Sequence, residues 1–276
     1  MTATPSPVPT AAERFFFETQ GYLVLENFFT AEHVARMRAA LAATIQRRRA
    51  SVPAGWKAVW PPRGPNDYTQ IHGAKSTRIL NLLEEDPLLF EPLTWPALQP
   101  YVQAFIHPQP HYLASDAIVE DPKDFADRRD GWHIDGSDEC YRRLRGPIPL
   151  LQLKLGIYLT DMTKPWRGNL TVVPGSQLSR AESTVEERKR REFFPGAQQV
   201  CAPAGSAILF HNAIWHTAAP YGPGEPGREM LYYAWEQPWM LAHTAHWSYS
   251  KEFYAGLKPA DRLLFHGFVF DPPEMR

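Results

Sequence analysis

The sequence is poor in several features that mark specialised classes of protein. It has 2 cysteines in 276 residues, too few for a disulfide framework, which fits a reduced, cytoplasmic setting. Its formal net charge of −1 shows no overall bias toward nucleic acid or membrane surfaces. No apolar run approaches the roughly 20 residues needed to cross a bilayer. With 44% hydrophobic and 21% charged residues, the chain has the composition of a soluble globular protein.

The first residues also lack the apolar segment of a signal peptide. Residues 1–11 are rich in Pro, Thr and Ser, and we expect them to form a flexible tail. Residues 12–276 show no internal repeat and no linker, so a single domain with a sizeable core is expected. We expect this domain to act on a small molecule as a monomer or a homodimer.

Proline and aromatic residues are plentiful, and they bear on the fold. The 27 prolines argue against an all-helical bundle. Between about residues 110 and 240, short β-rich segments alternate with Pro/Gly turns, which is typical of a sandwich or jelly roll. The first hundred residues are expected to be mostly helical, including 31–48, 77–83 and 87–105. The sequence therefore predicts a mainly β protein with helices packed on the outside of the sheet.

The most informative stretch is 131–136, Gly-Trp-His-Ile-Asp-Gly. In an extended strand, His133 and Asp135 point to the same face and offer a nitrogen and an oxygen ligand to one point. Two histidines and one carboxylate on one face of iron(II) leave the opposite positions open for oxygen and a co-substrate. Alone, the tripeptide is more often a pair of polar residues at a strand edge than part of a metal site. The assignment depends on a second histidine and an anchor for the co-substrate.

Both of these residues occur later in the chain. His216 lies in the segment 214–217, shortly after the apolar strand predicted for 207–210. Arg228 follows twelve residues later and opens the next predicted strand. The order His-x-Asp, distant His, Arg is far more specific than any one of its members.

In this order of residues the chain resembles the phytanoyl-CoA dioxygenase family, within the iron(II)- and 2-oxoglutarate-dependent oxygenases. The similarity is carried by 131–135, by 168–177 with its strand ending in Pro-Gly-Ser, and by 205–228. It extends over about residues 12–240. The resemblance implies a double-stranded β-helix, a jelly roll of the cupin kind.

The resemblance also implies roles for single residues. His133, Asp135 and His216 would bind iron(II), and Arg228 would pair with the distal carboxylate of 2-oxoglutarate. A guanidinium suits that task because it offers two parallel donors and stays charged. The near end of 2-oxoglutarate would chelate the iron, leaving one position for O2. Halogenating relatives have a small residue in place of the carboxylate, so Asp135 indicates oxygenation.

Two positions depart from the family pattern. Lys154 lies in the apolar segment 150–160, where a charge is costly unless it is paired. We expect it to reach the 2-oxoglutarate pocket, and the alternative is an exposed face of the strand. Ala218 stands where the family often has a hydroxyl side chain. Ser115, on the preceding predicted strand, is a further candidate for a co-substrate contact.

The predicted activity is hydroxylation, or another oxidation, of an unactivated C–H bond in a small polar molecule, with release of succinate and CO2. An amino-acid derivative or a secondary-metabolite intermediate fits a pocket that mixes aromatic and charged residues, although each aromatic could instead pack in the core. The candidate pocket residues are Trp60, Arg63, Trp132, Asp138, Glu139, Tyr141, Trp215 and Trp235. One alternative is a cupin-like metal-binding or sensing protein without turnover. A zinc hydrolase with the same ligands is another, but it would need no anchor such as Arg228.

Overall fold

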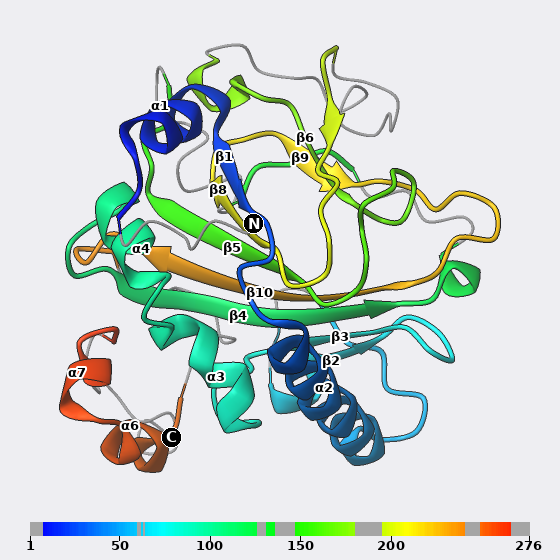
Figure 1. Cartoon of the computed structure of the whole chain (residues 1–276). Coiled ribbons are helices and arrows are strands. Elements are labelled where there is room, and N and C mark those ends of the chain that lie inside the picture. The colour runs from blue at the N-terminus through cyan, green and yellow to red at the C-terminus, as the bar shows by residue number, and fades with distance from the viewer. Residues whose placement is uncertain are drawn as a thin grey trace.

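The computed structural model describes residues 8–59, 62, 64–125, 131–135, 147–179, 195–240 and 249–265 (Figure 1). The helix predicted for 31–48 is present, and a shorter helix precedes it. Helix α1 (Ala11–Gln20) begins after Thr10, whose side chain accepts a hydrogen bond from the first turn, and ends at Gly21 with φ 81°. Helix α2 (Ala31–Ser51) begins after a second threonine cap, Thr30. The second cap fixes the start of the helix that the sequence predicts from residue 31.

The larger sheet has seven antiparallel strands in the order β1-β8-β5-β10-β4-β3-β2. Along the chain they are β1 (Tyr22–Leu25), β2 (Thr69–Ile71), β3 (Thr77–Leu80), β4 (His111–Glu120), β5 (Gln152–Tyr158), β8 (Ala207–His211) and β10 (Arg228–Glu236). The central strand β10 pairs Arg228 with Glu120 of β4 and Ala234 with Lys154 of β5. Because directly paired residues share a face, these four lie on one side of the sheet.

A second, smaller sheet covers that side. Its strands are β7 (Gln198–Gln199), β6 (Leu170–Val172) and β9 (His216–Ala218), in this order and antiparallel. A buried cluster joins the two sheets: Tyr158, Ile208, Phe210 and Met230 from the larger one meet Leu170 and Val172 from the smaller one. The arrangement is a two-layered antiparallel sandwich, as the strand pattern predicts.

Helices cover the opposite face of the larger sheet. Figure 1 shows α2 and α3 (Pro87–Thr94) on the side of this sheet away from β6 and β9. Every second residue of β5 and β10 faces these helices. Of these residues, Leu155, Leu231 and Tyr233 belong to one core cluster with Met37 of α2 and Leu89 of α3. The remaining short helices are α4 (Gln99–Phe105), α6 (Lys251–Gly256) and α7 (Pro259–Arg262), with 3₁₀ turns at Pro65–Tyr68, Pro122–Asp124 and Ser176–Leu178.

One helix prediction is wrong. Residues 77–80 form strand β3, which pairs with β4 from Thr77 opposite Val119 to Leu80 opposite Asp116. A short apolar run is compatible with either state, and here the hydrogen bonds offered by the edge of β4 decide it. Most of the predicted flexible tail, residues 1–7, lies outside the described residues. Among the helices that are described, none has the length and apolarity needed to cross a membrane.

Candidate metal centre and co-substrate site

The segment with His133 lies directly beside the strand with His216. The two residues exchange backbone hydrogen bonds, His133 N to His216 O at 3.0 Å and His216 N to His133 O at 2.9 Å. Asp135 N donates to Asn212 O at 2.8 Å and extends this pairing. Trp215 N donates to Ser176 Oγ at 2.8 Å, which ties the second histidine to the Pro-Gly-Ser turn. Backbone pairing thus holds together two segments that lie about 80 positions apart in the sequence.

This pairing brings three ligand atoms together. His133, Asp135 and His216 each offer one atom, and these atoms lie within 4.8 Å of one another. The Nδ1 atom of His133 lies 3.2 Å from Gly131 O, and that of His216 lies 3.0 Å from Ile214 O. A carbonyl can only accept, so each Nδ1 carries the proton and each Nε2 keeps its lone pair. Hydrogen bonds of this kind orient histidines for metal binding.

The charges of the cluster also suit a divalent metal. Burial lowers the pKa of His216 to about 4, which keeps its ring neutral at pH 7. Burial alone would raise the pKa of Asp135, but the positive charge of Lys154 and the neighbouring histidines outweigh it and lower that pKa to about 2. Metal ligation requires these deprotonated forms. Two imidazoles and a carboxylate are the donor set of a facial iron(II) site, so the residues fit this metal.

Lys154 lies inside the protein. Its side chain is 15% exposed, and its Nζ lies 3.7 Å from Asp135 Oδ2. On the register it is flanked by Phe210 and Ala234, which confirms that it shares the sheet face that carries the site. The alternative of an exposed lysine is therefore wrong. A largely buried cation beside the carboxylate of a candidate metal ligand is a feature of this chain that the family pattern does not imply.

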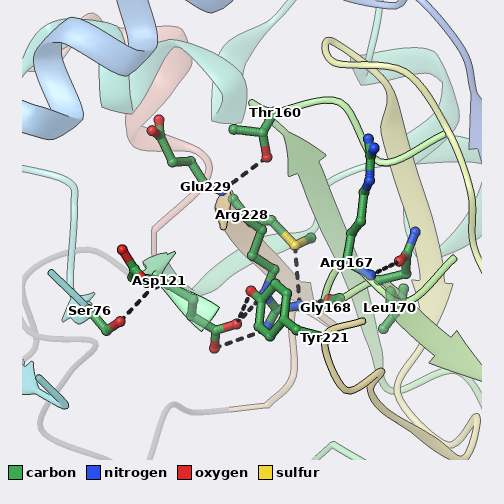
Figure 2. A network of polar contacts seen from close by, with 12 residues as sticks. Ser76, Asp121, Thr160, Arg167, Gly168, Leu170, Tyr221, Arg228 and Glu229 are labelled. Carbon is green, nitrogen blue, oxygen red and sulfur yellow. Dashed lines mark hydrogen bonds and ion pairs between the residues drawn. The ribbon is translucent and has the colours of Figure 1, made fainter. Parts of the chain in front are cut away.

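Arg228 begins β10 on the same inner face, and it is engaged by neighbouring groups (Figure 2). Its Nε donates to Glu120 Oε2 at 2.7 Å and its Nη2 to Glu120 Oε1 at 3.2 Å. Its Nη1 donates to the carbonyl of Gly168, and the Tyr221 hydroxyl donates to Glu120 Oε2 at 2.8 Å. Burial would lower the pKa of Arg228, but Glu120 outweighs this effect and raises it. The guanidinium is charged and rigidly held.

Gly168 is required for this arrangement. Its φ is +77°, and a Cβ there would lie 2.6 Å from the Tyr221 hydroxyl oxygen and 2.9 Å from Arg228 Cδ. The glycine that opens the block 168–177 therefore lets the backbone approach the arginine. Glu120 was not predicted, because no motif contains it and only the register of β4 on β10 places it opposite Arg228.

The structure brings only some of the other predicted site residues together. Trp132 is buried and Trp215 half-buried, and each is next in sequence to a candidate metal ligand. Trp235 lies in the helix-side core, and the buried Ser115 Oγ accepts from Leu82 N at 2.9 Å, so neither is brought into the site. Five predicted pocket residues lie outside the described residues: Trp60, Arg63, Asp138, Glu139 and Tyr141.

The structure also adds a pair of residues that the sequence did not predict. Arg78 of β3 donates through Nε to Asp116 Oδ2 at 2.8 Å. Asp116 lies opposite Tyr232 of β10, and the charge of Asp135 acts on Arg78. Arg78 was not predicted as a site residue because 77–83 was expected to be a helix. Only the pairing of β3 with β4 places Arg78 near the site.

Comparison with known families decides the family of this chain. The sequence model described as phytanoyl-CoA dioxygenase (PhyH) matches residues 17–222, well over half of the chain. The chain belongs to the phytanoyl-CoA dioxygenase family. With its His-Asp-His cluster, this member of the family is a 2-oxoglutarate-dependent non-haem iron oxygenase that uses iron(II) and 2-oxoglutarate. No curated protein matches the chain.

Solved structures share the fold of this phytanoyl-CoA dioxygenase family member at low sequence identity. HygX from Streptomyces hygroscopicus, with nickel and 2-oxoglutarate bound, has a TM-score of 0.61 at 17% identity, covering 87% of this chain and 93% of its own. The carbocyclase SnoK from nogalamycin biosynthesis has a TM-score of 0.58 at 18% identity, covering 86% and 88%. The epimerase SnoN from the same biosynthesis has a TM-score of 0.54 at 15% identity, covering 82% of each chain. The predicted double-stranded β-helix is thereby confirmed.

Proposed function

We propose that this oxygenase hydroxylates, or otherwise oxidises, an unactivated C–H bond of a small polar natural-product intermediate or amino-acid derivative. His133, Asp135 and His216 hold the iron, and Arg228 pairs with the distal carboxylate of 2-oxoglutarate. The single observation that carries this proposal is the cluster of three ligand atoms within 4.8 Å of one another. When bound, iron(II) with 2-oxoglutarate and O2 supplies the oxidant, and succinate and CO2 are released.

The protein's own contribution is to orient the ligands and to fix their protonation. The carbonyls of Gly131 and Ile214 hold the two imidazole rings with Nε2 directed to the cluster. Lys154 keeps Asp135 ionised from a distance of 3.7 Å. Because all three ligand positions are filled by protein groups, the site favours oxygenation over halogenation.

Lys154 has a second role in this proposal. A carboxylate adjacent to a keto group would enter the site next to the metal ligands, where Lys154 supplies a buried positive charge. The lysine would then face the near carboxylate of 2-oxoglutarate, while Arg228 faces the distal one. Two cations for two carboxylates match the charge of the co-substrate.

The substrate class is supported by the structural relatives. HygX has been crystallised with hygromycin B, and SnoK is described as a carbocyclase of nogalamycin biosynthesis. Trp132 and Trp215, next in sequence to the proposed metal ligands, are the described candidates for aromatic contact with the substrate. A polar molecule with ring systems or several hydrogen-bonding groups suits such surroundings.

The test is a turnover assay of protein reconstituted with iron(II). Succinate is measured with 2-oxoglutarate and O2, with and without panels of aminoglycosides, polyketide intermediates and amino-acid derivatives, and products are followed by mass. Substrate-stimulated succinate with a gain of one oxygen, or a loss of two hydrogens, is expected. Succinate no higher than in His216→Ala across all panels would contradict the proposal, and so would chlorinated product in the presence of chloride.

A further inference from the structure

Arg228 is paired with a carboxylate of the protein itself. Glu120 binds it through two hydrogen bonds, and the side chains of both residues are only 3% exposed. An ion pair buried to this extent has little water to screen it, so each charge strongly affects the other. The affinity of Arg228 for any further anion therefore depends on Glu120.

Most of the hydrogen bonds that Arg228 can donate are already used. A guanidinium has five N–H groups, arranged along its edges. The edge formed by Nε and Nη2 is taken by Glu120, and Nη1 donates to the Gly168 carbonyl and contacts Met230 Sδ at 3.6 Å. One Nη2 N–H remains, on the edge that Nη2 shares with Nη1. The distal carboxylate of 2-oxoglutarate would bind at this partly used edge.

Glu120 is itself held in place. The Tyr221 hydroxyl donates to its Oε2 at 2.8 Å, and the strand register fixes its backbone opposite Arg228. Figure 2 shows Tyr221, Gly168 and Arg228 gathered around this point. The carboxylate is thus part of a built network and would stay beside the guanidinium when an anion arrives.

We propose that Glu120 is a positioning residue that orients Arg228 and competes with 2-oxoglutarate for its charge, and so sets the affinity for the co-substrate. This inference rests on the proposed role of Arg228 as the anchor of the distal carboxylate. One positive charge shared by two carboxylates in a buried place binds each less strongly than it would bind one alone, because the carboxylates repel each other.

The variant Glu120→Gln removes the negative charge and keeps the shape of the side chain. Arg228 is then left uncompensated, so the ligand-free protein should have a lower Tm. A ligand that restores the missing negative charge recovers that loss, and 2-oxoglutarate should bind at least about tenfold more tightly than in the wild type.

The experiment compares two ligands on anaerobic protein loaded with iron(II). The first is 2-oxoglutarate, and the second is 2-oxopentanoate, which has the same chelating end but no distal carboxylate. Dissociation constants come from titration of the iron-ligand absorption, and the shift in Tm is measured in parallel. The gain in Glu120→Gln should appear for 2-oxoglutarate and be absent for 2-oxopentanoate.

Glu229→Gln is the matched control. Glu229 is the next residue to Arg228 and makes an equally bidentate pair with Arg38, with distances of 2.7 and 2.8 Å. Loss of this pair should leave the affinity for both ligands unchanged. Glu120→Asp, which keeps the charge but shortens the reach to Arg228, should give a smaller gain for 2-oxoglutarate and answers the same question if the glutamine variant does not fold.

The possible results separate this inference from the proposed function. Equal or weaker binding of 2-oxoglutarate in the Glu120 variants, or an equal gain for 2-oxopentanoate, would overturn the competing role of Glu120. If the wild type and the Glu120 variants bound both ligands equally well, the anchor role of Arg228 itself would be wrong, and this inference would fall with it.

Discussion

The inner face of the larger sheet carries buried charge in two places, and the two are built differently. In the first place, near Lys154 of β5, Asp135 Oδ2 lies 3.7 Å from Lys154 Nζ and 3.7 Å from His216 Nε2. These distances are longer than a direct hydrogen bond. At the start of β10, Arg228 and Glu120 meet at 2.7 Å. The ligand atoms of His133, Asp135 and His216 converge on a common point, whereas Arg228 and Glu120 form a matched pair.

This difference separates the candidate metal site from the proposed anchor of the co-substrate. Donor atoms that converge without satisfying one another are stabilised when a cation joins them. In a matched pair the two charges already compensate each other. A ligand that binds there gains binding free energy only from the charge and the hydrogen-bond donors that the pair has not used. Substitution of His133, Asp135 or His216 in the first place should therefore abolish activity, whereas substitutions in the second should change stability and the requirement for co-substrate.

The largest effect is expected at the converging group. His133→Ala or His216→Ala removes a metal ligand, so iron binding and succinate formation should fall by more than the roughly 10–100-fold that loss of a ligand's supporting partner costs. Iron content and succinate release are measured together. His107→Ala, which removes a ring that accepts a hydrogen bond from Gln109 N, is the control and should keep wild-type activity. Near-normal activity in either ligand variant would place the metal elsewhere.

At the matched pair, Arg228→Ala should raise the KM for 2-oxoglutarate by about 10- to 100-fold, the worth of a charge-assisted bidentate contact. It also leaves Glu120 buried without its counter-charge, so the free energy of unfolding should fall by about 3–5 kcal/mol. Initial rates and urea denaturation measure the two effects. An unchanged KM would mean that another residue holds the distal carboxylate.

Glu236, at the end of β10 opposite to Arg228, should make the stability of the protein depend on pH. Burial raises the pKa of Glu236, opposed by Lys154, from 4.5 to about 7. The folded state then holds a proton that the unfolded state has lost, so stability should decrease as the pH rises from 4.5 through 7. Wild-type protein should lose up to about 3 kcal/mol relative to Glu236→Gln over this window. Urea denaturation at pH 5 and pH 8 tests this, with the exposed Glu26→Gln as control.

Absence of any pH-dependent gap between wild type and Glu236→Gln would show that Glu236 ionises as an ordinary exposed carboxyl.

The smallest effect is expected at Lys154. Lys154→Met keeps the length of the side chain and removes its charge, so the KM for 2-oxoglutarate should rise about three- to tenfold, the worth of a single hydrogen bond to a charged group. Iron content should be preserved because the three ligands remain. Lys75→Met, at a side chain 76% exposed, is the control. A KM equal to that of the control would remove Lys154 from the co-substrate site.

The converging group could be predicted from the sequence because it depends on short-range rules. Strand alternation places His133 and Asp135 on one face, and the order of His216 and Arg228 behind them is specific. The same alternation, counted from Arg228 along β10, places Trp235 on the face of the larger sheet away from the site. There it belongs to the core cluster between the sheet and the helices.

The matched pair could not be predicted, because its members are 108 residues apart and meet through strand register alone. Arg78 was missed for a related reason. Its apolar surroundings fit a helix or a strand, and only the pairing of β3 with β4 decides between them.

The most direct test of the central claim is the absorption spectrum of the protein mixed with iron(II) and 2-oxoglutarate without oxygen. Chelation of iron by the keto and carboxylate oxygens should produce a visible metal-to-ligand charge-transfer band in the wild type. His133→Ala and His216→Ala should lack this band. A wild-type protein that binds iron(II) but shows no such band with saturating 2-oxoglutarate would contradict the site described by His133, Asp135 and His216.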